Sequence, residues 1–168
     1  DPARAQRAMG ALMQMQKIEL EKIRQAANDD SKTVITVQAT VLAPISKVWQ
    51  LWTQPEHITQ WNNASDDWHT PRAENDLRVG GRFSSRMEAK DGSFGFDFGG
   101  VYDQVLENKR IDYTLEDNSM VQIHFSEVEG GTFVMDSFEA ENMHAVDMQR
   151  AGWQAILDNF KKYAERIG

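Results

Sequence analysis

Cysteine is absent from the 168-residue sequence, and histidine is scarce. The lack of cysteine excludes disulfide bonds, thiol nucleophiles and thiolate metal sites, and it fits the cytoplasm, where we expect the protein. The four histidines, His57, His69, His124 and His144, lie far apart, and no two have the i, i+4 spacing of paired zinc ligands on a helix. We therefore expect no metal ion and no cofactor.

Basic residues are in the minority. The sequence has 18 Lys and Arg against 26 Asp and Glu, which gives a net charge of −8. Because nucleic acids and anionic membrane surfaces bind to basic patches, we expect neither of them as a partner. No apolar run approaches the roughly 18 residues that a membrane-spanning helix needs, so we also expect no membrane insertion.

The apolar content is nevertheless sufficient for a folded domain. Hydrophobic residues make up 40% of the chain and include five Trp and eight Phe. A chain of this length suits one domain with an appendage. The appendage is residues 1–30, because residues 3–27 favour a helix and the polar stretch NDDSK at 28–32 marks a boundary. We expect this N-terminal helix to pack on the domain over residues 33–168 or on a second copy of the chain, as a homodimer.

The strongest periodic pattern lies at the C-terminal end, over residues 145–167. Bulky apolar residues recur at helical spacing on one face, and the opposite face is charged. The apolar face comprises Val146, Trp153, Ile156, Leu157, Phe160, Tyr163, Ala164 and Ile167. At 1.5 Å per residue, about 22 residues form a rod of roughly 33 Å, which needs a wide surface to lie on.

A series of strands supplies that surface. Alternating apolar residues predict strands at 33–42, 82–89, 94–106, 111–115, 121–125 and 132–138, with short helices at 46–53 and 55–61 and a loop at 62–74. The expected order is a strand, two short helices, about five or six antiparallel strands and the long helix. Because strands and helices are segregated, we predict an α+β fold in which a curved antiparallel sheet wraps around the C-terminal helix, with a cavity between them.

Several short strings resemble one superfamily. They are GVYDQV at 100–105, KRI at 109–111, GGT at 130–132 and GWQAILDNF at 152–160. These strings resemble the START-like (SRPBCC, helix-grip) superfamily, and within it the homologues of the activator of the ninety-kilodalton heat-shock protein ATPase. The string DWHTPRAENDLRVGG at 67–81 is similar to a signature of a bacterial subgroup of that branch. The resemblance spans residues 33–166 and implies the helix-grip fold.

The resemblance implies less about function, because the superfamily includes lipid carriers, polyketide cyclases and hormone receptors. The name of the branch implies one alternative, a co-chaperone-like stimulator of a chaperone ATPase. Residues 5–19 resemble something different, the last helix of vicinal-oxygen-chelate proteins. That second resemblance implies that the N-terminal helix is a relic or part of a fusion.

Aromatic residues and methionines are the candidates for lining a ligand cavity. They are Trp52, Trp61, Trp68, Phe83, Met87, Tyr102, Tyr113, Met135 and Trp153, and the alternative for each is a place in a plain core. Pockets for small molecules are mostly apolar with a few placed polar groups, which Tyr102, Tyr113 and His69 could supply. The sequence therefore predicts binding of a small hydrophobic or lipid-like molecule.

Two polar residues carry further hypotheses. His69 lies close in sequence to Asp67 and Asp76 and could act as the general base of a cyclase-type or hydrolase-type enzyme; the alternative is an exposed loop. Asp136 lies on a predicted strand. If it faces inward, it is a buried acid in the cavity with a raised pKa, and if its sequence neighbours face inward instead, it is solvated. The alternation of the strand leaves both arrangements of Asp136 open.

Overall fold

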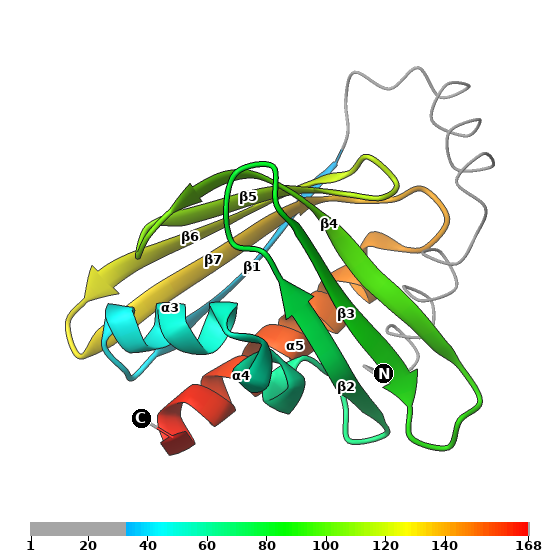
Figure 1. The fold of residues 1–168 in the computed structure, drawn as a ribbon, viewed down its shortest axis with the longest axis horizontal. Helices are drawn as coiled ribbons and strands as arrows, with labels where there is room; N and C mark the ends of the chain where they lie inside the picture. The colour runs from blue at the N-terminus through cyan, green and yellow to red at the C-terminus, as the bar shows by residue number, and fades with distance from the viewer. Residues whose placement is uncertain (1–32, 168) are drawn as a thin grey trace.

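The computed structural model describes residues 33–167. In chain order its elements are β1 (Val34–Val41), α3 (Ile45–Thr53), α4 (Pro55–Trp61), β2 (Trp68–Asn75), β3 (Arg82–Ala89), β4 (Gly95–Leu106), β5 (Arg110–Leu115), β6 (Met120–Val128), β7 (Gly131–Glu139) and α5 (Val146–Ile167) (Figure 1). The predicted α+β helix-grip architecture is confirmed. The predicted N-terminal helix, and the homodimer that it would form, lie outside the described residues.

The strands form a seven-stranded sheet in the order β1-β7-β6-β5-β4-β3-β2. All neighbouring strands are antiparallel. Strands β2 to β7 follow one another as a meander, whereas β1 pairs with β7, from Val34 opposite Glu139 to Val41 opposite Thr132. The sheet is curved, and α3, α4 and α5 lie on the same side of it (Figure 1). The three helices therefore cover one face of the sheet.

Tight turns join the central strands at the predicted positions. The turn between β3 and β4 contains Gly92 with φ +77°, a left-handed conformation that glycine adopts without steric cost. Asn108 and Asn118, in the next two turns, have φ values of 63° and 69°. Asparagine tolerates this region better than most residues with a side chain. The Asp-Gly and Asn signals thus fix where each strand reverses.

The prediction of a loop over residues 62–74 is wrong in its second half. Residues Trp68–Asn75 form β2, which pairs with β3 at the edge of the sheet. Pro71 argues against a strand in the sequence, because proline cannot donate a hydrogen bond to a neighbouring strand. An edge strand tolerates it, and here it lies where the register shifts between His69 and Arg72. With β2 included, six strands follow the two short helices.

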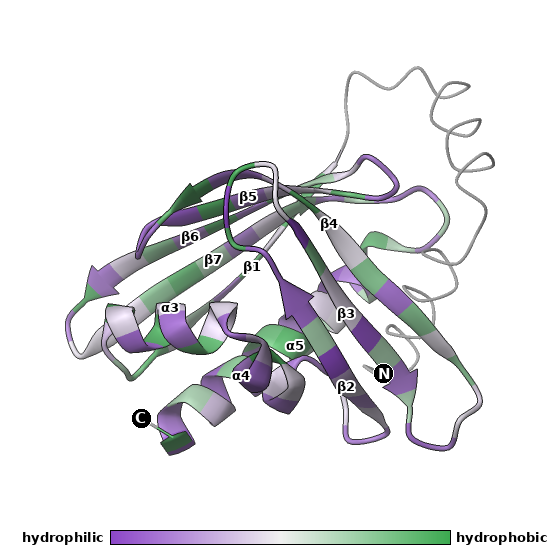
Figure 2. Cartoon of the chain, viewed as in Figure 1, coloured by the Kyte–Doolittle hydropathy of each residue, from purple (hydrophilic) through white to green (hydrophobic). Residues whose placement is uncertain are grey.

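Polar and apolar residues alternate along the strands (Figure 2), and the apolar face packs against the helices. Phe160 of α5 is fully buried, with its ring centroid 4.8 Å from that of Trp52 in α3 and 4.9 Å from that of Trp61 in α4. Burying such a side chain contributes roughly 1.5–3 kcal/mol. Ile167, predicted on the buried face, is instead exposed in the last turn. None of the helices within residues 33–167 is long and apolar enough to cross a membrane.

Candidate ligand-binding cavity

A cavity of about 90 Å³ lies between the covered face of the sheet and the helices. Strands β3, β4, β5 and β7 contribute its sheet side, and α3, α4 and α5 contribute the other side. The lining residues are Trp52, Ile58, Trp61, Asn62, Phe83, Ser85, Met87, Phe98, Tyr102, Ile111, Tyr113, Asp136, Trp153, Ile156 and Leu157. The lining is thus mainly aromatic and aliphatic, with a few polar groups.

Most of the predicted cavity residues do line this space. They are Trp52, Trp61, Phe83, Met87, Tyr102, Tyr113, Asp136 and Trp153. Trp153 lies in the first half of α5 and stacks on Phe138 of β7, with ring centroids 3.9 Å apart and planes inclined by 15°. The second half of α5, where Phe160 is buried, is part of the continuous core. The cavity therefore lies beside the first half of α5.

Two predicted residues lie away from the cavity. Trp68 is buried in a separate apolar cluster with Met87, Ala89 and Phe96, where it makes an edge-to-face contact with Phe96. Met135 alternates with buried residues on β7, so its side chain points to the opposite face of the sheet. The geometry gives neither residue a direct contact with a ligand in the cavity.

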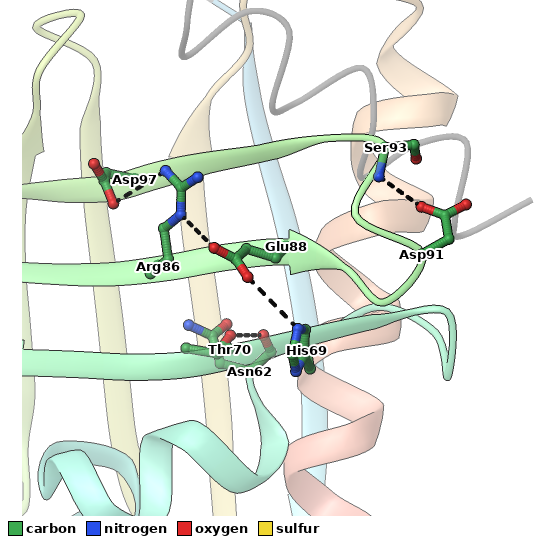
Figure 3. A network of polar contacts seen from close by, with 8 residues as sticks. All are labelled: Asn62, His69, Thr70, Arg86, Glu88, Asp91, Ser93 and Asp97. Atoms are coloured by element: carbon green, nitrogen blue, oxygen red, sulfur yellow. Dashed lines mark hydrogen bonds and ion pairs between the residues drawn. The ribbon is translucent and has the colours of Figure 1, made fainter.

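His69 also lies outside the lining, on β2. Its Nε2 is 3.8 Å from Glu88 Oε1, and the side chain is 44% exposed. Arg86 donates to Glu88 through Nε at 2.9 Å and lies 3.6 Å from Asp97 (Figure 3). The hydrogen bond from Arg86 lowers the pKa of the Glu88 carboxyl. His69 thus belongs to an exposed charge network, and its carboxylate partner is Glu88 rather than the predicted Asp67 or Asp76.

The two lining tyrosines provide hydroxyl groups. The Tyr102 hydroxyl donates to Asn75 Oδ1 at 2.5 Å, and Asn75 Nδ2 donates to the Thr53 carbonyl oxygen, which fixes the tyrosine ring. Phe83 lies against both tyrosines, with ring centroids 5.2 Å from Tyr102 and 4.7 Å from Tyr113. Burial raises the pKa of Tyr102 and of Tyr113, so both hydroxyls stay protonated at neutral pH.

Asp136 faces inward, which settles the question that the strand alternation leaves open. It alternates along β7 with partly exposed residues and shares the buried face with Val134 and Phe138. Its side chain is buried, and its Oδ1 atom has no hydrogen-bond partner within the described part of the chain. Burial raises the pKa of the Asp136 carboxyl to about 7. The cavity therefore contains one acid that titrates near neutral pH.

Sequence reasoning missed seven lining residues: Ile58, Asn62, Ser85, Phe98, Ile111, Ile156 and Leu157. A signal existed for two of them. Ser85 shares its strand face with Phe83 and Met87, and Phe98 alternates with Tyr102 on the same face of β4. The aliphatic residues carry no such signal, because an isoleucine beside a cavity and one in a filled core look the same in sequence.

Within residues 33–167, the lining contains no histidine or lysine that could activate the Ser85 hydroxyl as a nucleophile. Among residues 33–167, no group of three or more metal-ligating side chains is placed to hold a metal ion. The cavity is an apolar, aromatic space whose lining also includes tyrosine and serine hydroxyl groups and the Asp136 carboxyl group.

Comparison with known proteins agrees with the architecture. A solution NMR structure of an AHSA1-like protein from Aeromonas hydrophila is 45% identical to this chain, with a TM-score of 0.77 over 81% of this chain and 94% of that chain. A solution structure from Cytophaga hutchinsonii is 47% identical, with a TM-score of 0.68 over 81% and 93% of the two chains. No curated protein matches this chain.

A structure with lower sequence identity is similar to this chain in fold alone. A crystal structure from Chromobacterium violaceum is 21% identical, with a TM-score of 0.70 over 79% of this chain and 96% of that chain. The family model described as "Activator of Hsp90 ATPase homolog 1-like protein" matches residues 42–165, which include the elements that enclose the cavity from α3 to α5. The chain therefore belongs to the Activator of Hsp90 ATPase homolog 1-like family, within the helix-grip superfamily that the sequence resemblance predicted.

Proposed function

We propose that this protein binds a small, mainly apolar molecule in the cavity between the sheet and α5. The observation that carries the proposal is the lining itself, in which aromatic rings from the sheet and the helices surround a space with few polar groups. Pockets of this composition are typical of small-molecule sites.

The size of the cavity limits the ligand. Sites for drug-sized molecules measure roughly 300–1,000 Å³, whereas this one measures about 90 Å³. The buried part of the ligand is therefore small, either a compact molecule or one end of a longer, lipid-like molecule that leaves the cavity. Wall residues on α5 and α4, such as Trp153 and Ile58, are only partly buried, so the wall of the cavity is partly exposed there.

The proposal is tested by filling the cavity. Ser85 is buried and faces the cavity, whereas Ser84 is its neighbour on β3 and faces away. Ser85→Leu places a bulky side chain in the space, and Ser84→Leu adds the same apolar group outside it. Binding of toluene and 1-hexanol is measured by chemical-shift titration of the full chain, and we expect Ser85→Leu to weaken it at least about tenfold, a loss of roughly 1.4 kcal/mol.

Ser84→Leu should bind both probes as the unaltered protein does, which controls for added hydrophobicity. Circular dichroism establishes that Ser85→Leu is folded, and Ile111→Phe, at another position of the lining, is a second cavity-filling variant. Wild-type-like binding in both cavity-filling variants would place the ligand elsewhere and contradict the proposal.

The two alternatives have weaker support. A catalytic role for His69 lacks a cavity, because the histidine is half exposed in the Arg86–Glu88 charge network. A co-chaperone role is supported by the family name, and stimulation of a chaperone ATPase by the purified protein would be its direct measurement. The cavity lining supports neither alternative, so ligand binding is the function that we propose.

A further inference from the structure

Asp136 is the acid in the wall of the cavity, and its surroundings are apolar. On β7 it lies between Val37 of β1 and Ile123 of β6, its two partners in the sheet register. It is 6% exposed, and its carboxyl group lines the cavity. A carboxylate in such a place loses its hydration without gaining a compensating charge.

No protein group within residues 33–167 offers that compensation at Oδ1, which has no hydrogen-bond partner there. In the described part of the chain, the lining includes no arginine, lysine or histidine. Tyr102 already donates its hydroxyl proton to Asn75, so that proton is committed elsewhere. Buried polar groups in folded proteins are nearly always satisfied, and an exception at a cavity wall points to a partner that arrives with a ligand.

The aromatic rings of the cavity wall indicate the charge of the ligand group that would pair with Asp136. Phe83, Tyr113, Phe98 and Trp153 all line the same space as Asp136. The faces of aromatic rings attract cations, most strongly when the cation is removed from water. An anionic ligand would meet a like charge, and a purely apolar ligand would leave the carboxyl group unpaired.

We propose that the cavity recognises organic cations, with a protonated amine bound to the Asp136 carboxylate and the apolar part of the ligand against the aromatic rings. This inference rests on the proposed function and specifies its ligand class. The amine donates hydrogen bonds to the carboxylate, and no covalent step is involved. The small cavity volume suits an ammonium group with a short apolar substituent.

Protonation of Asp136 makes the affinity for a cation depend on pH. Burial raises the pKa of Asp136 to about 7, so below this pH the acid is mainly neutral and offers less to a cation. The other ionisable groups of the lining are Tyr102 and Tyr113, whose pKa values are raised by burial, so both stay neutral across this range. Val37 and Ile123 on the neighbouring strands and Trp153, Ile156 and Leu157 on α5 carry no charge. Amine binding should therefore strengthen between pH 6 and pH 8.

The test compares three probes of similar shape: benzylamine, benzyl alcohol and benzoate. Chemical-shift titration of the full chain at pH 8 gives the affinity of each. Because a hydrogen bond to a charged group contributes more than a neutral one, we expect benzylamine to bind about 10- to 100-fold more tightly than benzyl alcohol. Benzoate should bind least, and lowering the pH to 6 should weaken benzylamine but not benzyl alcohol.

Asp136→Asn supplies the matched variant, because it keeps the shape of the side chain and removes the charge. It should lose most of the preference for benzylamine over benzyl alcohol, which is the ratio that the charge of Asp136 sets. The comparison among probes in the unaltered protein does not depend on this variant folding.

The outcomes separate the two proposals. Equal binding of benzylamine and benzyl alcohol would keep the cavity as a ligand site and overturn the cation inference. A preference for benzyl alcohol that grows at pH 6 would also overturn it, because a protonated Asp136 would then be the donor. Absence of binding by all three probes, together with absence of toluene binding, would overturn the proposed function itself.

Discussion

At the scale of single residues, Asp136 is the position where the stability of the fold conflicts with the cation binding that we propose. Its carboxyl group is buried on the inner face of β7 with an unpartnered oxygen. A folded chain gains nothing from such a group, since an apolar residue of similar size would avoid the cost of desolvation. Stability therefore gives no reason for this acid, whereas the cation binding that we propose would give one.

This conflict predicts a pH dependence of stability. The pKa of Asp136 is raised from an ordinary value of 3.8 to about 7, so between these pH values the unfolded chain loses its proton while the folded chain keeps it. The contribution of Asp136 to stability is then highest at acidic pH, falls as the pH rises through this window, and levels off above about 7. The shift corresponds to about 4 kcal/mol between the two limits.

Urea unfolding of the unaltered protein and of Asp136→Asn, from pH 4 to pH 8, measures this effect. The variant should match the unaltered protein near pH 4 and exceed it in unfolding free energy by several kcal/mol, about 4 at most, near pH 8. Asp66→Asn, which changes an exposed carboxyl, should show no such pH-dependent difference. A constant difference between the Asp136 variant and the unaltered protein at all pH values would contradict the burial of an uncompensated acid.

At the scale of elements, the periodic patterns predicted the strands and α5 well because their apolar residues recur at a clear interval. Strand β2 has no clear alternation, because Pro71 and a register shift interrupt it and because an edge strand needs only one partner. The orientation of Asp136 is open in the sequence for a related reason. Both faces of β7 carry large apolar residues, so the alternation alone could not say which face is covered.

Strand β2 is tied to α3 through one side chain. Asn75 accepts a hydrogen bond from the Tyr102 hydroxyl. It also donates one to the carbonyl oxygen of Thr53, the last residue of α3. Asn75→Ala leaves a buried tyrosine hydroxyl without its acceptor, and we expect it to lower the unfolding free energy by about 1–3 kcal/mol.

Thermal or chemical denaturation measures this loss, and Glu74→Ala, at the exposed neighbouring position of β2, is the control, expected to stay within about 0.5 kcal/mol of the unaltered protein. Comparable losses in both variants would show that the strand, rather than the Asn75 bridge, is responsible.

At the scale of the whole molecule, Phe160 joins three helices. Its ring contacts Trp52 of α3 and Trp61 of α4 from its position on α5, and it is completely buried. Phe160→Ala removes aromatic contacts that each short helix makes with the long one. We expect it to cost about 3–5 kcal/mol of stability, because the rigid aromatic neighbours cannot collapse into the space.

Lys162→Ala, two residues along α5 and exposed, should leave the unfolding free energy within about 0.5 kcal/mol of the unaltered value. Calorimetry of both variants provides the measurement. A loss below 1 kcal/mol for Phe160→Ala would mean that the three helices are held mainly by other contacts.

The overall architecture was predictable because segregated strands and one long amphipathic helix admit few arrangements. Most of the aromatic cavity wall was predictable for the same reason, since Phe83, Tyr102 and Trp153 lie on the faces that the sheet and α5 turn toward each other. The existence of empty space was not predictable, because volume depends on how side chains from distant strands and helices meet. His69 is a residue whose sequence neighbours suggested catalysis but whose position does not support it. In the structure its side chain is 44% exposed and lies beside Glu88, outside the cavity lining.

The pairing of β1 with β7 has a consequence for how the chain is made. Val34 finds its partner Glu139 only after the five intervening strands and both short helices have been synthesised. During synthesis, β1 therefore lacks its partner in the sheet until β7 has left the ribosome. Contacts between such distant parts of a chain form slowly, since a long loop must close before they do. The sheet is therefore complete only after β7 has been synthesised, and the cavity only after α5, which forms one side of it, has followed.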